Sequence, residues 1–173
     1  MRNSFLAVLA IGAMAGPSLA MELTSPDIVD GKPLPIELNY TRCGGSNISP
    51  ALVWSGAPAG TKSFVLTVID TSVKPLGWSH WIVMQIPPGA HAFAKGIAKL
   101  PNGSVVVKSN FGDYFYDGPC PPAGSGLHRY EFTIWALGSK DIQLKPDAPA
   151  DEISAALTKK ALGKATLTGT VER

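Results

Sequence analysis

Three apolar runs rich in β-branched and aromatic residues constrain the fold more than any other feature of this sequence. They cover residues 63–70 (SFVLTVID), 79–86 (SHWIVMQI) and 128–137 (HRYEFTIWAL). Turn residues precede the first run and two prolines end the second, as is typical of strands. In the third run, successive residues alternate between two faces that are both largely apolar. A strand of this kind is buried on both sides, so we expect central strands of a sandwich.

Shorter strands and one helix complete the expected secondary structure. The shorter strands are predicted at residues 36–40, 51–54, 105–108 and 165–171. The helix is predicted to begin with Asp151 as its N-cap and to end at Gly163, with apolar residues at helical spacing between them. A strand-dominated order with one late helix favours a mainly β fold, an antiparallel β-sandwich with one or two peripheral helices, over a doubly wound sheet.

The composition agrees with a single turn-rich domain. The chain has 173 residues, of which 45% are hydrophobic and 16% are charged, and these values exclude an intrinsically disordered protein. Glycine (18 residues) and proline (15 residues) are frequent enough to supply many turns. The formal charge is +2 and no run of Lys or Arg concentrates it, so we expect no nucleic-acid partner.

The N-terminus has the organisation of a secretory signal peptide. Arg2 gives a basic start, residues 5–15 (FLAVLAIGAMA) form an apolar run, and small residues lead to Ala20. The apolar run is shorter than the roughly 20 residues of a membrane-spanning helix, and we expect no membrane span. A buried helix is the alternative, which is disfavoured because the run is apolar on every face. We predict a signal peptide at 1–20, cleaved near Ala20, and one periplasmic or secreted domain at 21–173.

Export changes how the two cysteines are interpreted. In an oxidising compartment an even number of cysteines is typical of disulfides. Cys43 and Cys120 are 77 positions apart, and a bridge between them would stabilise the fold by about 4–5 kcal/mol in the chain-entropy model. A metal site is the alternative, but two isolated cysteines lack the paired spacing of zinc ligands. We therefore predict a disulfide and no metal site.

Four motifs follow one another in an order that is hard to obtain by chance. They are N-I-S-P-A-L-x-W from Asn47, G-T-K-S-F-x-L from Gly60, W-S-H-W from Trp78, and G-P-C-P-P followed by H-R-Y from Gly118. This ordered set resembles the phosphatidylethanolamine-binding protein family, in its bacterial Raf-kinase-inhibitor-like (YbhB/YbcL) branch. The resemblance covers roughly residues 36–171. It implies a β-sandwich with a small surface pocket for phosphate, a phospholipid headgroup or a similar anion.

The resemblance also implies which residues form the pocket. By position they are Asp70, His80, Gly118, Pro122, His128 and Tyr130, with Trp78 as a wall. Asp70 ends one predicted strand, and His80 and His128 open two others, so these three side chains can meet at one rim of the sandwich. A histidine can donate N–H groups to phosphate oxygens while a carboxylate orients its ring. Without the resemblance, a structural role for each histidine would be the better prediction. Asn47 and Ser49 are expected to tie the neighbouring loop through bonds to the backbone.

The chain departs from the family pattern directly after Asp70. Where relatives carry D-P-D-A-P, residues 70–75 read D-T-S-V-K-P, so Ser72 takes the place of the second acid. The loss of this carboxylate and the gain of Lys74 are expected to make the mouth of the pocket less negative, which favours anions.

Three classes of function compete at this stage. The first is an exported binding or regulatory module for an anionic small molecule. The second is a protein-interaction module that inhibits an exported protease, because relatives are known as kinase regulators and protease inhibitors. The third is an enzyme that uses Asp70, His80 and His128 as acid–base groups or metal ligands. The chain lacks G-x-S-x-G, H-E-x-x-H and P-loop motifs, so we predict binding, with no catalytic residue and no cofactor.

Overall fold

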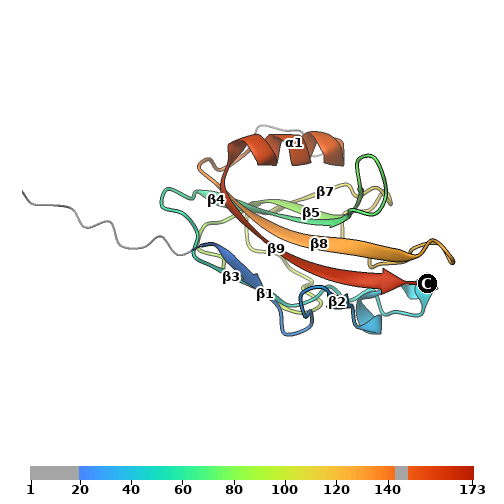
Figure 1. Cartoon of the computed structure of the whole chain (residues 1–173). Helices are drawn as coiled ribbons and strands as arrows, with labels where there is room; N and C mark the ends of the chain where they lie inside the picture. The colour runs from blue at the N-terminus through green and yellow to red at the C-terminus, as the bar shows by residue number, and fades with distance from the viewer. Residues whose placement is uncertain (1–19, 143–147) are drawn as a thin grey trace, which may run out of the picture.

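Strands dominate the computed structural model, which describes residues 20–142 and 148–173 (Figure 1). The smaller sheet has the order β1 (Glu22–Thr24), β3 (Leu52–Ser55) and β6 (Ala92–Phe93). The larger sheet has the order β2 (Lys32–Pro33), β9 (Ala161–Glu172), β8 (Leu127–Leu137), β4 (Ser63–Asp70), β5 (Trp78–Ile86) and β7 (Val105–Val107). Neighbouring strands are antiparallel except β2 and β9, which are parallel. The predicted antiparallel β-sandwich is confirmed.

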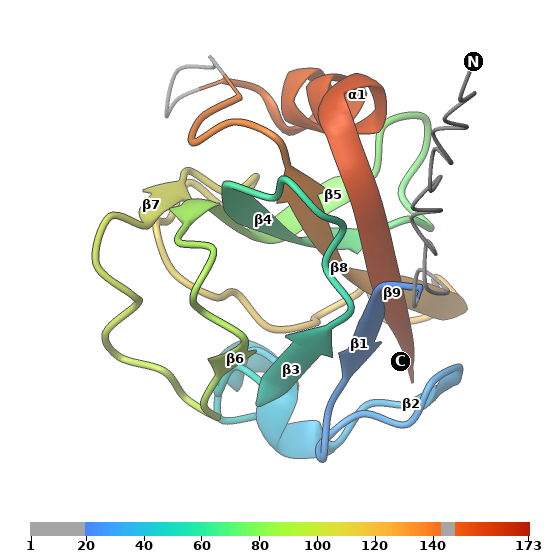
Figure 2. The same cartoon turned by 90° about the vertical axis from the view of Figure 1, so that its left-hand side faces the viewer.

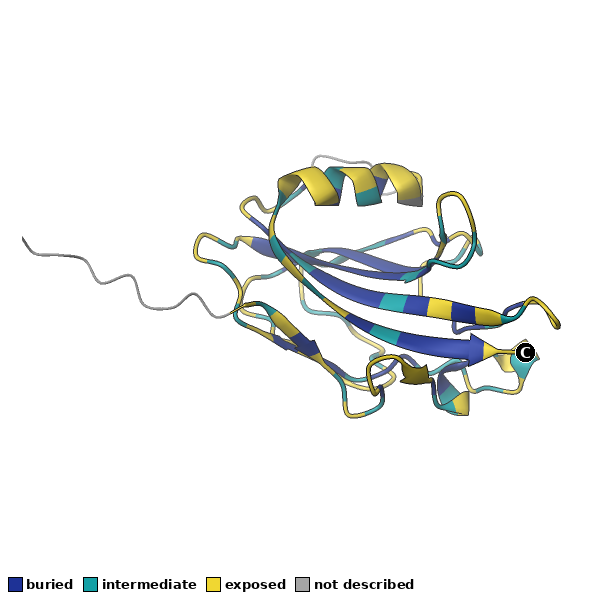
Figure 3. Cartoon of the chain, viewed as in Figure 1, coloured by how far each residue is buried: buried dark blue, intermediate teal, exposed yellow. Residues whose placement is uncertain are grey.

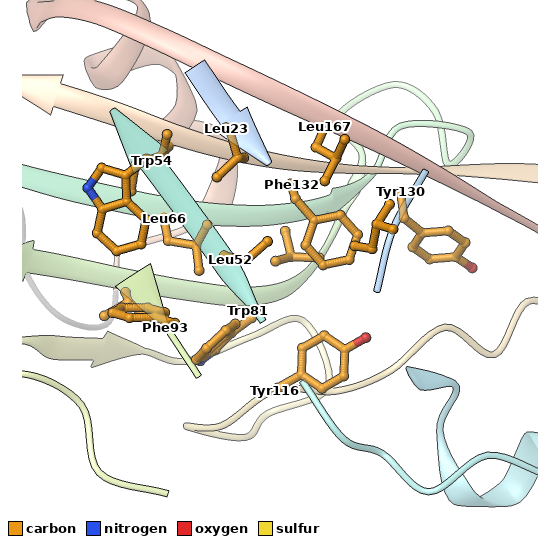
Figure 4. Packing of buried hydrophobic residues seen from close by; sticks show 14 of the residues in the cluster. Leu23, Leu52, Trp54, Leu66, Trp81, Phe93, Tyr116, Tyr130, Phe132 and Leu167 are labelled. Atoms are coloured by element: carbon orange, nitrogen blue, oxygen red, sulfur yellow. The ribbon is translucent and has the colours of Figure 1, made fainter. Parts of the chain in front are cut away.

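The core lies between the two sheets (Figure 4). Side chains alternate between the two faces of each central strand, so one face of every such strand contributes to this core. On β4 these inward residues include Phe64 and Leu66, and on β8 they include Phe132, all with exposed fractions of 0%. Trp54 of β3 packs edge-to-face on Phe64, which joins the small sheet to the large one.

A single α-helix of the described residues, α1 (Ala150–Lys160), covers the outer face of the large sheet (Figures 1 and 2). Ile153 and Leu157 are fully buried against residues of that face, which include Val65 and Ile82. The opposite side of the helix is exposed (Figure 3), as expected of an amphipathic surface helix. No helix among the described residues is both long and apolar enough to cross a membrane.

The ends of the helix differ from the prediction. The helix begins at Ala150 after Pro149, without a side-chain cap, and Asp151 lies in its first turn. It ends at Lys160 because Ala161 already has extended backbone angles and pairs with Leu137. Gly163 therefore lies within β9 and does not end the helix, and β9 begins before the predicted residue 165.

The predicted strand at 36–40 is wrong. Ile36–Leu38 form a 3₁₀ turn, because the N–H groups of Leu38 and Asn39 bond locally to the carbonyls of Pro35 and Ile36. The other predicted strands are present within a few residues of their predicted ends. The proposed signal peptide, except Ala20, lies outside the described residues and stays a prediction.

The predicted disulfide is confirmed. Cys43 and Cys120 are bonded, with Cα atoms 5.5 Å apart. The bridge joins the 3₁₀ turn Thr41–Cys43 to the segment that precedes β8. Two segments that are distant in the sequence are thereby tied together at one end of the sandwich.

Candidate functional site

A cavity of about 260 Å³ lies where β4 ends and where β5 and β8 begin. Six of the predicted residues line it, namely Asp70, Trp78, His80, Pro122, His128 and Tyr130. The strand termini bring them together because β4 pairs with both β5 and β8, with Asp70 opposite Trp78 on one side and Tyr130 on the other. The rest of the lining is mostly apolar, which is typical of a small-molecule site with a few polar groups.

Asp70 and His128 form a buried pair in the cavity wall. The Asp70 Oδ2 atom lies 2.6 Å from His128 Nδ1, and the exposed fractions of the two residues are 3% and 7%. The other oxygen, Oδ1, accepts the backbone N–H of Ser72 at 2.9 Å. Ser72 Oγ in turn accepts the N–H of Arg129 at 3.0 Å. Ser72, which stands where the family has an acid, thus fastens the loop after β4 to β8.

The second ring nitrogen of His128, Nε2, also has a hydrogen-bond partner. His128 Nε2 lies 2.9 Å from Ser125 Oγ, and this hydroxyl lies 2.6 Å from the carbonyl oxygen of Pro122. The Ser125 hydroxyl therefore lies between the Pro122 carbonyl and the His128 ring, within hydrogen-bond distance of both. A ligand that binds Nε2 must replace Ser125 as its partner.

His80 is held in a neutral state by its surroundings. Its ring lies between Phe111 and Tyr130, with 5.1 Å between ring centroids in each pair. Burial lowers the pKa of His80 from 6.5 to about 4, although the backbone bond to Asp117 and the charge of Asp70 act in the opposite direction. Its Nδ1–H donates to the carbonyl oxygen of Asp117 at 2.7 Å. In this neutral ring Nε2 is an acceptor, so His80 differs from the N–H donor that we expected.

Tyr130 and Trp78 complete the wall of the cavity. Burial and the nearby Asp70 carboxylate raise the pKa of the Tyr130 phenol above its usual range, so its hydroxyl keeps its proton. Trp78 is 37% exposed and packs edge-on against Phe111, with ring centroids 5.7 Å apart. The indole thus stands partly in solvent at the edge of the cavity.

Asn47 holds the start of the segment 118–122 in place through two hydrogen bonds to the backbone. Asn47 donates from Nδ2 to the Tyr116 carbonyl at 3.1 Å and accepts the Gly118 N–H at 2.7 Å, so its predicted bonds to the backbone are confirmed.

Gly118, predicted as a pocket residue, does not line the cavity. Its Cα packs so closely on the Leu38 carbonyl and the adjoining backbone that a Cβ has no room. Lys74 also lies outside the lining, so its charge does not face the cavity as expected.

Asp117 is a buried acid behind His80. Its exposed fraction is 0%, and Ser109 Oγ donates to its Oδ2 at 2.9 Å. Its Oδ1 has no hydrogen-bond partner among the described residues. Burial raises the pKa of Asp117 to about 6, with a further contribution from the charge of Asp113. In the described part of the chain, no group of three His, Cys, Asp or Glu side chains is arranged to hold a metal ion.

A known protein family matches most of the chain. The model of the family "Phosphatidylethanolamine-binding protein" matches residues 24–172. The chain belongs to the phosphatidylethanolamine-binding protein family. Within it, the chain is 34% identical to the UPF0098 protein YbcL of Escherichia coli over 173 residues, which cover 95% of this chain and 94% of YbcL. It is 36% identical to YbhB of the same organism over 155 residues, covering 86% and 98% of the two chains. The chain therefore falls in the bacterial YbhB/YbcL branch.

Two further comparisons extend this assignment. The crystal structure of E. coli YbcL superposes with a TM-score of 0.83 at 32% identity, covering 90% of this chain and 99% of that one. A Mycobacterium tuberculosis protein named as a lipoprotein, LppC, is 38% identical over 152 residues, covering 88% of this chain and 72% of LppC. The family's fold is thus shared across most of the chain.

Several cavity residues were not predicted from the sequence. Val73, Phe111, Cys120 and Pro121 complete the lining, and Ser125 and Asp117 contact the two histidines. Phe111 lies in the segment N-F-G, and Cys120 and Pro121 lie in G-P-C-P-P, so their positions near the motifs were the available signal. Nothing in the sequence marks Ser125 or Asp117, because their contacts arise only from the folded loops.

Proposed function

We propose that this member of the family is an exported binding module for phosphate monoesters and phosphoryl headgroups, and that it acts by binding rather than by catalysis. The observation that carries the proposal is the convergence of Asp70, His80 and His128 on one cavity. Export is supported by the disulfide, which is typical of oxidising compartments, and by the lipoprotein name of LppC.

The polar groups of the cavity suit a ligand that carries both a phosphoryl group and a donor. The His128 ring and the Tyr130 hydroxyl are the groups that can donate to phosphoryl oxygens. The neutral His80 supplies an acceptor, which fits the hydroxyl of a singly protonated phosphate or an ammonium group. The apolar wall, which includes Val73 and Phe111, suits the carbon chain of a headgroup. Phosphoethanolamine combines all these features.

Replacing His128 with alanine is expected to weaken phosphoethanolamine binding about tenfold, because a hydrogen bond to the phosphoryl group is lost. Isothermal titration calorimetry measures this change. The matched control is His91→Ala, since His91 is exposed and lies outside the cavity. Thermal unfolding of each variant shows whether the fold is kept. Equal affinities for the wild type and a folded His128→Ala variant would contradict the proposal.

Replacing Ser125 with alanine is expected to have the opposite effect and to strengthen phosphate binding by about two- to tenfold. In the wild type the ligand must compete with Ser125 Oγ for His128 Nε2, and the net value of one such hydrogen bond is about 0.5–1.5 kcal/mol. The same calorimetric titration measures the gain. Weaker binding by the variant would show instead that the hydroxyl is itself a contact of the ligand.

A further inference from the structure

The outer face of the large sheet has two halves of different chemistry. Beneath α1 it is apolar, with Val65 and Met84 packed on the helix. Beside this apolar half, the same face carries Thr67 on β4, Glu131 and Thr133 on β8, and Lys164 on β9. Polar residues are usual on a part of an antiparallel sheet face that no helix covers, and what distinguishes these residues is the cavity that they line.

A second cavity of about 280 Å³ lies over this polar half. The sheet forms its floor, Ser154 of α1 contributes to one wall, and the β4–β5 loop, residues 71–77, forms another. That loop rises from the sheet on the same side as α1 (Figures 1 and 2). The volume is close to the lower limit for small-molecule sites, so a small ligand fits it. The cavity shares none of its lining residues with the His80–His128 cavity.

The floor of the second cavity is held in one geometry by its own contacts. Trp135 Nε1 donates to Thr67 Oγ1 at 3.0 Å, and Thr133 Oγ1 lies 2.9 Å from Thr166 Oγ1. The Lys164 ammonium lies over the Trp135 ring, 4.7 Å from its centroid. Thr67 and Thr133 are 3% and 4% exposed, so their hydroxyls lie at the base of the cavity and not on open surface.

Charges of both signs surround this floor without neutralising one another. Lys74, Lys164 and Glu131 all line the cavity, and no ion pair joins any two of them in the described ranges 20–142 and 148–173. Their sum is one positive charge. A complementary ligand has one ammonium for the glutamate, carboxylates for the two lysines, and a net charge of minus one.

We propose that the second cavity binds a small dicarboxylic amino acid. Its ammonium group contacts Glu131, its carboxylates contact Lys74 and Lys164, and the threonine hydroxyls and the Trp135 ring form the surface beneath its carbon chain. This site is separate from the phosphoryl site and does not depend on it.

The test uses the full-length mature chain labelled with ¹⁵N, with L-glutamate as the probe and glutarate as the analogue without an ammonium group. The readout is the indole N–H resonance of Trp135, assigned by its loss in Trp135→Phe. We expect a saturable shift with millimolar glutamate and at least about tenfold weaker binding of glutarate, because one charged hydrogen bond is missing. The shift is expected to persist in His128→Ala, which separates this site from the phosphoryl site.

Variants of the lining complete the test. Glu131→Gln and Lys164→Gln are expected to weaken glutamate binding about tenfold each. Lys74→Gln, on the exposed loop, provides the same test should the sheet variants unfold. The matched control is Lys62→Gln, an exposed lysine outside this cavity, which is expected to change nothing. No saturable shift in the wild type, equal binding of glutarate, or unchanged affinity in all folded lining variants would overturn the proposal.

Discussion

Replacement of both Cys43 and Cys120 by alanine is expected to lower the free energy of unfolding by about 4–5 kcal/mol. The bond links residues that are 77 positions apart, so its removal restores a large conformational freedom to the unfolded chain. Such a loss is a large fraction of the 5–15 kcal/mol by which domains are usually stable. It is the largest change in stability that we expect from altering one bond in this protein.

Guanidinium-induced unfolding of the oxidised wild type and of the double variant measures this loss. The wild type unfolded in the presence of a reductant is the matched control, because it lacks the bond but keeps both side chains. We expect the reduced wild type to approach the double variant in stability. A loss below about 1 kcal/mol in both samples would show that the unfolded chain is not constrained as the chain-entropy model requires.

The second large effect concerns Asp117 and the dependence of stability on pH. Asp117→Asn is expected to stabilise the protein by up to about 3 kcal/mol at pH 7 and to have little effect near pH 4. Burial raises the pKa of Asp117 from 3.8 to about 6. Between these values the folded carboxyl keeps a proton that the unfolded chain has released, so stability is lost as the pH rises through this window. Asparagine removes that loss.

His80 changes the free energy of unfolding with pH in the opposite direction. Its pKa is about 4 in the folded protein against 6.5 for a free histidine. On acidification the unfolded chain binds this proton first, so stability is lost as the pH falls from 6.5 to 4. In the wild type the contributions of Asp117 and His80 oppose each other over the shared window. In Asp117→Asn the opposing Asp117 contribution is removed, and His80 is expected to lower stability by roughly 3 kcal/mol on acidification.

Urea unfolding of the wild type and of Asp117→Asn at a series of pH values between 4 and 7.5 measures how the free energy of unfolding depends on pH in each protein. Asp151→Asn is the matched control, because Asp151 is an exposed acid in the first turn of α1. A pH profile of Asp117→Asn parallel to that of the wild type would mean that Asp117 already ionises in the folded protein as it does in water.

The parts of the fold that could be predicted are those determined by local pattern. The run at 63–70 became β4 because alternate residues have apolar partners on both faces, in the core and under α1. The segment 36–40 (IELNY) also contains β-branched and aromatic residues, but Pro35 and local hydrogen bonds favour a 3₁₀ turn. The end of α1 was missed since strand pairing with β8, not Gly163, ends the helix. Local hydrogen bonds decided the first case and strand pairing decided the second.

The candidate site could also be predicted only in part from the sequence. Asp70, His80 and His128 could be placed at one rim because each lies near the end of a predicted strand and belongs to a motif of the resemblance. The lowered pKa of His80 could not be predicted from the sequence, because it results from burial of the ring in the folded protein. Nor could the contacts of the two rings with Asp117 and Ser125, which arise only through folded loops.

The β4–β5 loop, residues 71–77, also forms part of both cavities. Val73 lines the His80–His128 cavity, and Thr71 and Lys74 line the outer one. It is also the place where this chain departs from the D-P-D-A-P pattern of the family. An insertion or deletion of one residue here would therefore alter the walls of both cavities in a single step, whereas a substitution at Val73 or Lys74 would alter only one of them.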